Sequence, residues 1–137
     1  MVDTTIGAQE NYTKRTSTSD LYKLCKELGL TNVHVCRQSD LKQTLSNKRI
    51  RNIIINLDDY GGGSHWVAIN TPKKMYFDSY AQYPPLSVPK VYKMASQKKE
   101  LQSIEATDCG ALCALWLYYI NYKSNPDYYK LFRDCYK

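Results

Sequence analysis

Four residues of this chain carry the side-chain types that a cysteine nucleophile and its catalytic partners need. His65 follows a triple glycine, Asp78 lies 13 positions later, and Gln102 precedes Cys109 by seven positions. A cysteine attacks a carbonyl carbon as its thiolate, and a histidine oriented by a carboxylate can take up the thiol proton. These requirements make Cys109 a candidate nucleophile and His65 its base. Asp78 is the candidate orienting acid, and the Gln102 amide is a candidate oxyanion donor, because it donates hydrogen bonds without ionising.

Cys109 stands where the sequence turns from polar to apolar, within the stretch EATDCGALCALW (105–116). The chain is apolar nearly all round from 109 to about 122, which predicts a central buried helix that begins at Cys109. Free N–H groups at a helix N-terminus stabilise a thiolate. Gly110 has no Cβ, so a substrate backbone could come close there. For Cys109 taken alone, a buried core thiol is the competing interpretation. The other cysteines are expected to be such packed thiols: Cys25, Cys36, Cys113 and Cys135.

Two runs, HWVAIN (65–70) and KMYFDSY (74–80), predict a β-hairpin that brings His65 and Asp78 together. A turn centred between Thr71 and Pro72 places His65 opposite Asp78, and pairs Trp66 with Phe77. If the turn shifts by one residue, Asp78 faces Val67 and becomes a diagonal neighbour of His65. In both registers the His65 and Asp78 side chains lie on the same side of the sheet.

Other residues compete for these roles less well. Asp58 and Asp59 are alternative acids, but they precede the glycines and no strand register places them beside His65. His34 is expected to be structural or exposed. No metal site is expected, because a Cys-x₃-Cys pair with two distant histidines lacks the spacing of a zinc site.

The remaining elements follow from periodicity and turn residues. A helix over 19–30 is capped by Ser19 or Asp20 and ended by Gly29. The apolar run 53–57 predicts a strand covered on both faces. Further predictions are a strand at 32–37, helices at 39–48, 90–100 and 124–137, a Pro-rich surface connection at 81–89 and an extended segment at 101–105. Together they predict an α+β fold: a small mixed or antiparallel sheet and flanking helices around the helix that begins at Cys109.

Length, charge and composition limit the classes of protein to which the chain can belong. A chain of 137 residues predicts one domain over 1–137, in which residues 1–17 are polar and expected to be loosely ordered. The formal net charge is +6, but the basic residues are scattered, which is typical of a solvated surface and favours weak nucleic-acid association. The longest apolar run, 111–120, is half the length a membrane span needs, about 20 residues. Without a signal peptide, an odd number of cysteines favours reduced thiols inside the cell.

The ordered set GGSHWVAI, FDSY and QSIEATDCG resembles the cysteine proteases of the adenovirus-protease and Ulp/SENP clan, over about residues 50–122. The resemblance implies that clan's fold, with His65, Asp78, Gln102 and Cys109 in the roles given above. It also implies that Trp66, beside the base, helps form a narrow channel over the substrate that favours glycine, next to Gly110.

Two features resemble the adenovirus-type branch: the interval of seven between Gln102 and Cys109, and the Gly-Gly before His65. That branch implies a thiol protease of virion maturation that cleaves viral precursor polypeptides after Gly-X-Gly or Gly-Gly. The expected enzyme is a monomer that acts away from membranes, requires no cofactor and is stimulated by non-specific DNA. It would work in the cytoplasm, nucleus or virus factory of the host cell and be packaged in the virion.

Two alternatives stay open. The tripeptide DCG (108–110) is the usual form in Ulp-type enzymes, which points to a protease that deconjugates SUMO or ubiquitin-like modifiers. The other is a non-catalytic, basic nucleic-acid-binding module. The hairpin between His65 and Asp78 is shorter than in the adenovirus pattern, and the whole chain is shorter than is usual in either branch. Because no cysteine lies between Asp78 and Cys109, activation by a disulfide-linked peptide, as in the adenovirus enzyme, is not expected.

Overall fold

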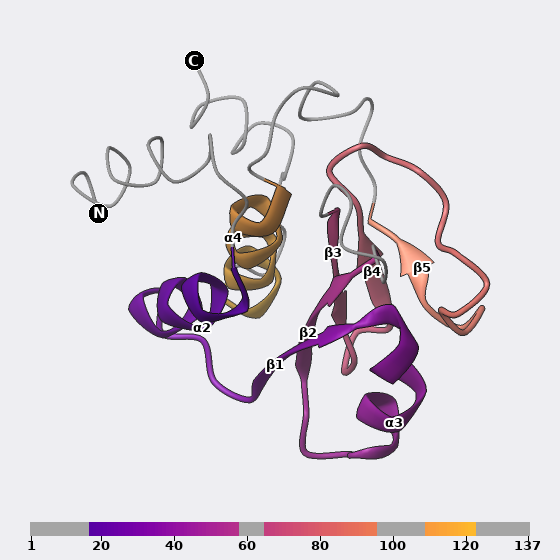
Figure 1. Ribbon diagram of the computed structural model, residues 1–137, viewed down its shortest axis with the longest axis horizontal. Helices are drawn as coiled ribbons and strands as arrows, with labels where there is room; N and C mark the ends of the chain where they lie inside the picture. Colours follow the sequence, from indigo (N-terminus) through magenta and orange to yellow (C-terminus); the bar gives the residue numbers. More distant parts are fainter. Residues whose placement is uncertain (1–16, 58–64, 96–108, 123–137) are drawn as a thin grey trace.

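A computed structural model describes residues 17–57, 65–95 and 109–122, which form a five-stranded mixed sheet with helices on both faces (Figure 1). The strands lie in chain order; β1 with β2 and β4 with β5 are parallel, and the two central pairs are antiparallel. The predicted α+β class is confirmed, with the mixed form of the sheet. The strands are β1 (Val33–Arg37), β2 (Asn52–Asn56), β3 (Trp66–Asn70), β4 (Met75–Phe77) and β5 (Lys93–Met94). The helices are α2 (Thr18–Glu27), the 3₁₀ turn η1 (Gln38–Asp40), α3 (Leu41–Ser46) and α4 (Cys109–Tyr122).

Helix α2 begins one position earlier than predicted, and its N-cap is Ser17 rather than Ser19 or Asp20. Ser17 and Asp20 form a capping box, in which each side chain accepts a hydrogen bond from the other residue's backbone N–H at 3.1 Å. The predicted end at Gly29 is confirmed. Gly29 has a positive φ of 74°, and the next N–H, that of Leu30, bonds back to the Cys25 carbonyl at 3.0 Å.

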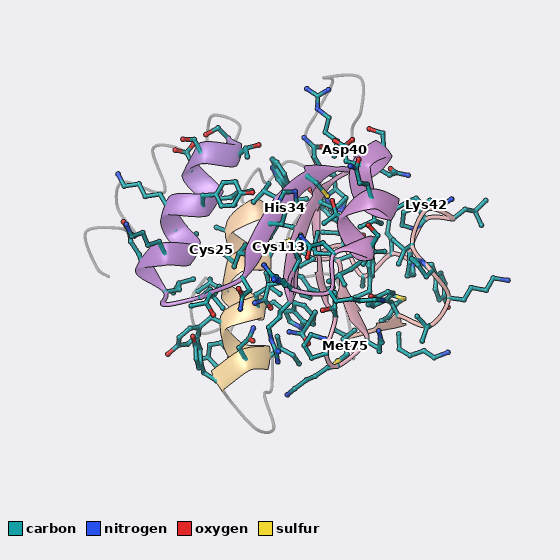
Figure 2. All side chains as sticks on the ribbon, turned by 90° about the horizontal axis from the view of Figure 1, so that it is seen from below. Cys25, His34, Asp40, Lys42, Met75 and Cys113 are labelled. Carbon is teal, nitrogen blue, oxygen red and sulfur yellow. The ribbon has the colours of Figure 1, made fainter. Side chains whose placement is uncertain are left out.

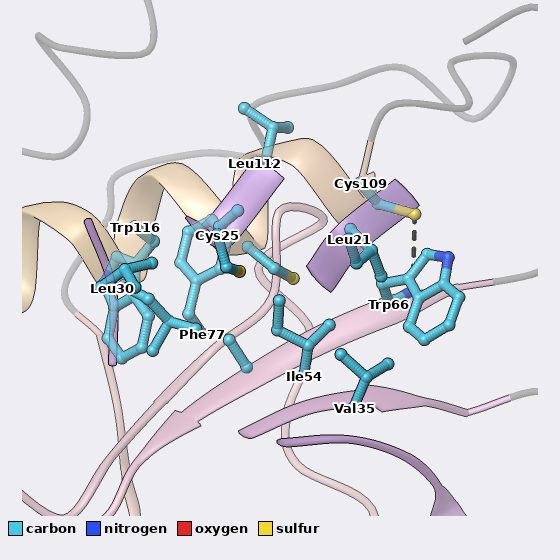
Figure 3. Close-up of a cluster of buried hydrophobic side chains, with 14 of the residues drawn as sticks. Leu21, Cys25, Leu30, Val35, Ile54, Trp66, Phe77, Cys109, Leu112 and Trp116 are labelled. Carbon is cyan, nitrogen blue, oxygen red and sulfur yellow. Dashed lines mark hydrogen bonds between the residues drawn. The ribbon is translucent and has the colours of Figure 1, made fainter. Parts of the chain in front are cut away.

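Helices α2 and α4 cover one face of the sheet (Figures 1 and 3). Ile54 of β2 points into the cluster beneath them, while Ile53 and Ile55 point into a second cluster on the opposite face. All three isoleucines are fully buried, so the prediction that this strand is covered on both faces is confirmed. Most residues of α4 are buried as well, which confirms the predicted central helix.

The opposite face of the sheet is covered by α3 and the irregular segment 81–92. The predicted helix at 39–48 is shorter, a 3₁₀ turn followed by α3, and Asp40 makes no capping bond with its side chain. Within 81–92, Val88 and Tyr92 pack into the core while Tyr83 and Leu86 are exposed. The prediction of a surface connection therefore holds for most of the segment.

The predicted helix at 90–100 is wrong for its described part, because Lys93 and Met94 form strand β5 instead. The Lys93 N–H bonds to the Lys74 carbonyl at 2.9 Å, and the Ala95 N–H bonds to the Tyr76 carbonyl at 2.6 Å. The free edge of β4 thus supplies the hydrogen-bond partners of β5, which the local sequence does not predict. Several other predicted features lie outside the described residues: residues 1–16, the glycines 61–63, the segment 101–105, the final helix at 124–137 and Cys135.

A cluster of three asparagines joins the end of α4 to the sheet. Asn52 of β2 accepts hydrogen bonds from the side-chain amides of Asn70 and Asn121, at 3.1 and 2.9 Å, and donates to the Thr31 carbonyl at 3.1 Å. Asn52 and Asn70 are each 2% exposed. Buried amides stabilise a structure only when they are paired, so these bonds fix how α4 lies across the sheet.

Candidate active site

The β3–β4 hairpin brings His65 and Asp78 together just beyond the ends of the two strands. The observed pairs include Ala68 with Phe77 and Ile69 with Tyr76, so one further step along the same register sets Asp78 opposite Val67. This is the second of the two predicted registers, in which His65 and Asp78 are diagonal neighbours. The His65 Nε2 lies 2.9 Å from the Asp78 Oδ1. The predicted contact between His65 and Asp78 is therefore confirmed.

The turn explains why the other register is wrong. The Lys74 N–H donates to the Thr71 carbonyl at 3.3 Å, which closes a turn with Pro72 at its first corner, the position that proline favours. Lys74 then takes a positive φ of 55° before β4 begins. The predicted cross-strand pair of Trp66 with Phe77 is consequently not formed. Phe77 stacks instead on Trp116 of α4, with ring centroids 5.3 Å apart.

Asp78 is held by its own chain. The Tyr80 N–H donates to the Asp78 Oδ1 at 2.8 Å, and the Ala81 N–H donates to the Asp78 carbonyl at 2.9 Å. The Tyr80 ring also lies against the His65 ring, with centroids 4.8 Å apart and an interplanar angle of 46°. Sequence reasoning missed Tyr80. The signal was the Asp-Ser-Tyr order, since an aspartate commonly accepts from the N–H two residues on.

Cys109 is the first residue of α4, and its Sγ accepts a hydrogen bond from the backbone N–H of Trp66 at 3.4 Å (Figure 3). Successive N–H groups of a strand point in opposite directions. The His65 carbonyl bonds toward β2, accepting from the Leu57 N–H at 2.9 Å, so the Trp66 N–H is directed toward β4. Because β4 ends at Phe77, that N–H has no strand partner and bonds to the sulfur instead.

The electrostatics of His65 favour a charged ring. Burial lowers the pKa of His65, but the hydrogen bond to Asp78, the interaction with Cys109 and the charges of both groups outweigh it and raise the pKa to about 9. Nε2 is taken by Asp78. Nδ1 is buried and has no hydrogen-bond partner among the described residues, which leaves it as the ring nitrogen available to interact with Cys109. The His65 side chain is 25% exposed against 2% for Asp78, so the site meets solvent at the imidazole.

The other described cysteines are free and buried, as predicted. Burial raises the pKa of Cys113 well above that of an ordinary thiol, and the nearby Cys109 raises it further. Burial also raises the pKa of Cys25, to about 11, and that of Cys36. All three therefore stay protonated at neutral pH, and a protonated thiol is a poor nucleophile.

Trp66 and Gly110 both lie beside Cys109. Trp66 is 4% exposed and packs in the cluster beneath α4, and its indole Nε1 is buried without a hydrogen-bond partner among the described residues. Gly110 is buried in the first turn of α4. Their predicted contacts with substrate stay predictions. His34 is half-buried on β1, two strands away from His65 in the sheet.

Gln102, Asp58 and Asp59 lie outside the described residues, so the oxyanion donor and the two alternative acids stay predictions. Within 17–57, 65–95 and 109–122, no group of three or more His, Cys, Asp or Glu side chains is placed to hold a metal ion. No helix in this same part of the chain is both long enough and apolar enough to cross a membrane.

Comparison of the chain with models of protein families, with curated proteins and with solved structures gives no match.

Proposed function

We propose that this protein is a cysteine endopeptidase whose nucleophile is Cys109, whose base is His65 and whose orienting acid is Asp78. The observation that carries the proposal is the convergence of the three side chains from separate elements. His65 and Asp78 lie 2.9 Å apart at the hairpin ends, and the Cys109 sulfur accepts from the backbone N–H next to His65. A thiol at a helix start, an imidazole and a buried carboxylate are the parts of an activated sulfur nucleophile.

In the first half of the reaction, the thiol proton resides on His65 and the Cys109 thiolate attacks the scissile carbonyl carbon. A C–S bond forms, and the carbonyl π electrons move to oxygen. The backbone N–H of Cys109 and the Gln102 amide are the donors proposed to stabilise this oxyanion. When the oxyanion collapses, the C–N bond breaks and the leaving amine takes its proton from His65. The product is a thioester on Cys109.

In the second half, neutral His65 takes a proton from a water molecule, whose oxygen attacks the thioester carbon. Collapse of this second oxyanion breaks the C–S bond, releases a carboxylic acid and restores the thiolate–imidazolium pair. The net reaction consumes one water for each peptide bond cleaved. Asp78 is proposed to orient the ring through Nε2 and to balance its positive charge.

The fold proposed for this chain is that of the adenovirus-protease and Ulp/SENP clan. A mixed sheet with a buried helix that begins at the nucleophile supports it, as does the order His, acid, Cys along the chain. Within the clan we assign the chain to viral maturation proteases that cleave precursor polypeptides after Gly-X-Gly or Gly-Gly. The supporting features are the Gly-Gly before His65 and the interval of seven between Gln102 and Cys109. The enzyme would then act in the infected cell or the virion, with DNA as a stimulant because the chain is basic.

The decisive experiment is covalent labelling with a Gly-Gly peptide that carries an electrophile at its C-terminus, followed by mass spectrometry of the modified residue. Cys109 should be labelled, and Cys109→Ala should abolish both labelling and peptide cleavage. Cys113→Ala is the matched control: it removes a thiol one helical turn away and should keep activity while losing about 1 kcal/mol of stability. Labelling of Cys113 in the wild type, or cleavage by Cys109→Ala, would show that the nucleophile is misassigned.

A second comparison separates the two branches of the clan. Short peptides ending in Gly-X-Gly or Gly-Gly are tested against folded ubiquitin-like fusions, each with and without DNA at low salt. Peptide cleavage that DNA accelerates, an effect that fades as salt rises, is expected. Efficient processing of the folded fusion with negligible peptide cleavage would instead favour a deconjugating protease.

A further inference from the structure

We propose that the groove between α3 and segment 81–92 binds an acidic peptide segment of a partner or substrate protein through an aliphatic side chain and a carboxylate. The groove has a volume of about 640 Å³, within the range of ligand sites in proteins. It lies over the second core cluster, on the face of the sheet opposite α4, and no residue of the candidate active site lines it. The proposal therefore does not depend on the chemistry at Cys109.

Three apolar side chains stand among the eight residues that line the groove. Leu45, Leu86 and Pro89 contribute the apolar lining, and the Leu86 side chain is fully accessible to solvent. Five large hydrophobic side chains are exposed in the described part of the chain, and three of them lie within 83–91: Tyr83, Leu86 and Val91. Apolar side chains gathered on one surface segment commonly mark a site of interaction with another protein.

Segment 81–92 is held in place by buried side chains and proline turns, so it can form one wall of the groove before a ligand binds. Val88 and Tyr92 are buried, and each follows a proline turn: the Val88 N–H bonds to the Pro85 carbonyl at 3.0 Å and the Tyr92 N–H to the Pro89 carbonyl at 3.1 Å. Proline fixes φ, so the segment has little backbone freedom left to lose when a ligand binds. A preorganised apolar wall favours an inserted aliphatic side chain.

The charge in the groove points to an acidic ligand. Lys42 is the one charged residue among those that line it, and Lys42 makes no ion pair or hydrogen bond with any described residue. Lys42 belongs to α3, and Figure 2 shows it on the side of the fold away from Cys25. Lys90, also exposed, adjoins the lining residue Pro89. An unpaired ammonium group beside an apolar wall is complementary to a carboxylate next to an aliphatic side chain.

A peptide fits these features better than a nucleic acid does. Strand binding to nucleic acid combines several cations with exposed aromatic rings on which bases stack. Here the lining offers one cation and no aromatic ring, and its polar residues are uncharged serines and a glutamine: Ser39, Ser46, Ser87 and Gln38. Hydroxyl and amide groups of this kind suit the backbone of an extended peptide.

The test uses the full chain with Cys109→Ala, so that binding is measured without cleavage and independently of the proposed enzyme activity. Random octapeptides displayed on phage are selected on this protein, and an enriched peptide is synthesised with a fluorescein label for anisotropy titrations. Lys42→Glu and Leu86→Ser are compared with Lys23→Glu, a matched charge change on the exposed side of α2. A labelled dT₁₂ oligonucleotide is titrated in parallel.

We expect enriched peptides to carry Asp or Glu beside an aliphatic residue. Lys42→Glu and Leu86→Ser should each weaken binding by about tenfold or more, whereas Lys23→Glu should change it by less than about twofold. The proposal is overturned if no peptide is enriched, or if all variants bind the peptide equally. It is also overturned if Lys42→Glu abolishes binding of the oligonucleotide while no peptide binds.

Discussion

Replacing Asp78 by asparagine should move the alkaline limb of the activity profile to lower pH. The amide keeps an oxygen that can accept from His65 Nε2 but carries no charge to balance an imidazolium. In the wild type the pKa of His65 is raised from 6.5 to about 9. That difference corresponds to about 3 kcal/mol in favour of the charged ring.

The structure indicates how much of this energy Asp78 supplies. Burial of the ring acts against the charge, so Asp78 and Cys109 together contribute more than the net amount. The hydrogen bond to Asp78 is the largest of the contributions that raise the pKa. Without the carboxylate, burial is opposed by Cys109 alone, and the pKa of His65 should fall back toward 6.5. At pH 7.5 a ring with a pKa near 6.5 is only about one-tenth charged, so under the proposed mechanism kcat/KM should drop by about tenfold.

Two measurements test this reasoning, and only one needs a substrate. The pH dependence of kcat/KM on a Gly-Gly peptide should show an alkaline limb near 9 in the wild type and a lower one in Asp78→Asn. An NMR titration that follows the imidazole carbon protons measures the pKa of His65 directly, and His34 in the same sample serves as the internal reference. If the two proteins share one His65 titration curve, Asp78 does not control the charge of the ring. Asp58 and Asp59 would then be tested as the acid by the same substitution.

Three further predictions concern the surroundings of the site. Tyr80→Ala should lower kcat more than Tyr80→Phe does, because only the alanine variant removes the ring that lies against the imidazole; equal kcat values for the two variants would refute this. A group whose pKa is raised on folding stabilises the fold fully below its unfolded pKa of 6.5 and loses that effect as pH rises through about 9. Urea unfolding of the wild type relative to His65→Gln should therefore show a relative loss of up to about 3 kcal/mol over that interval, and a difference that does not change with pH would contradict it. Asn52→Ala should cost about 1–3 kcal/mol in thermal or urea unfolding, since it removes the acceptor of the Asn70 amide and leaves the Asn121 amide only its bond to the Leu117 carbonyl; a loss below about 0.5 kcal/mol would show that the Asn70 amide finds another acceptor.

The sequence was sufficient to predict that His65 and Asp78 meet, because strand geometry repeats every two residues. Moving the turn by one residue changed the partner of Asp78 from His65 to Val67 but left both side chains on the same side. The helix that begins at Cys109 was predictable for a similar reason, since a segment apolar nearly all round has to be buried. Local periodicity therefore predicts which segments form helices and strands, and on which side of an element a residue lies.

What the sequence did not predict depends on partners far away in the chain. Strand β5 forms because the edge of β4 is free to pair with it, and the sequence of residues 90–95 gives no sign of that edge. The Trp66 N–H reaches the sulfur of Cys109 because β4 ends before it can pair with that N–H. Tyr80 could be linked to Asp78 by a local turn rule, but its contact with the His65 ring depends on where the hairpin ends.

The same long-range geometry distinguishes Cys109 from Cys113, two thiols on one helix and only four positions apart. A helical turn places both over the sheet, so periodicity alone cannot choose between them. Cys109 lies at the end of the sheet, where a strand has stopped, a backbone N–H is available and the His65 ring reaches solvent. Cys113 lies under the middle of α4 in the apolar cluster, where burial keeps its pKa well above the usual range. The proposed proton transfer to His65 is open to Cys109, whereas burial and the nearby Cys109, Asp78 and Cys25 all raise the pKa of Cys113 and keep it protonated. The proposed nucleophile is therefore the thiol at the end of the sheet, where α4 begins.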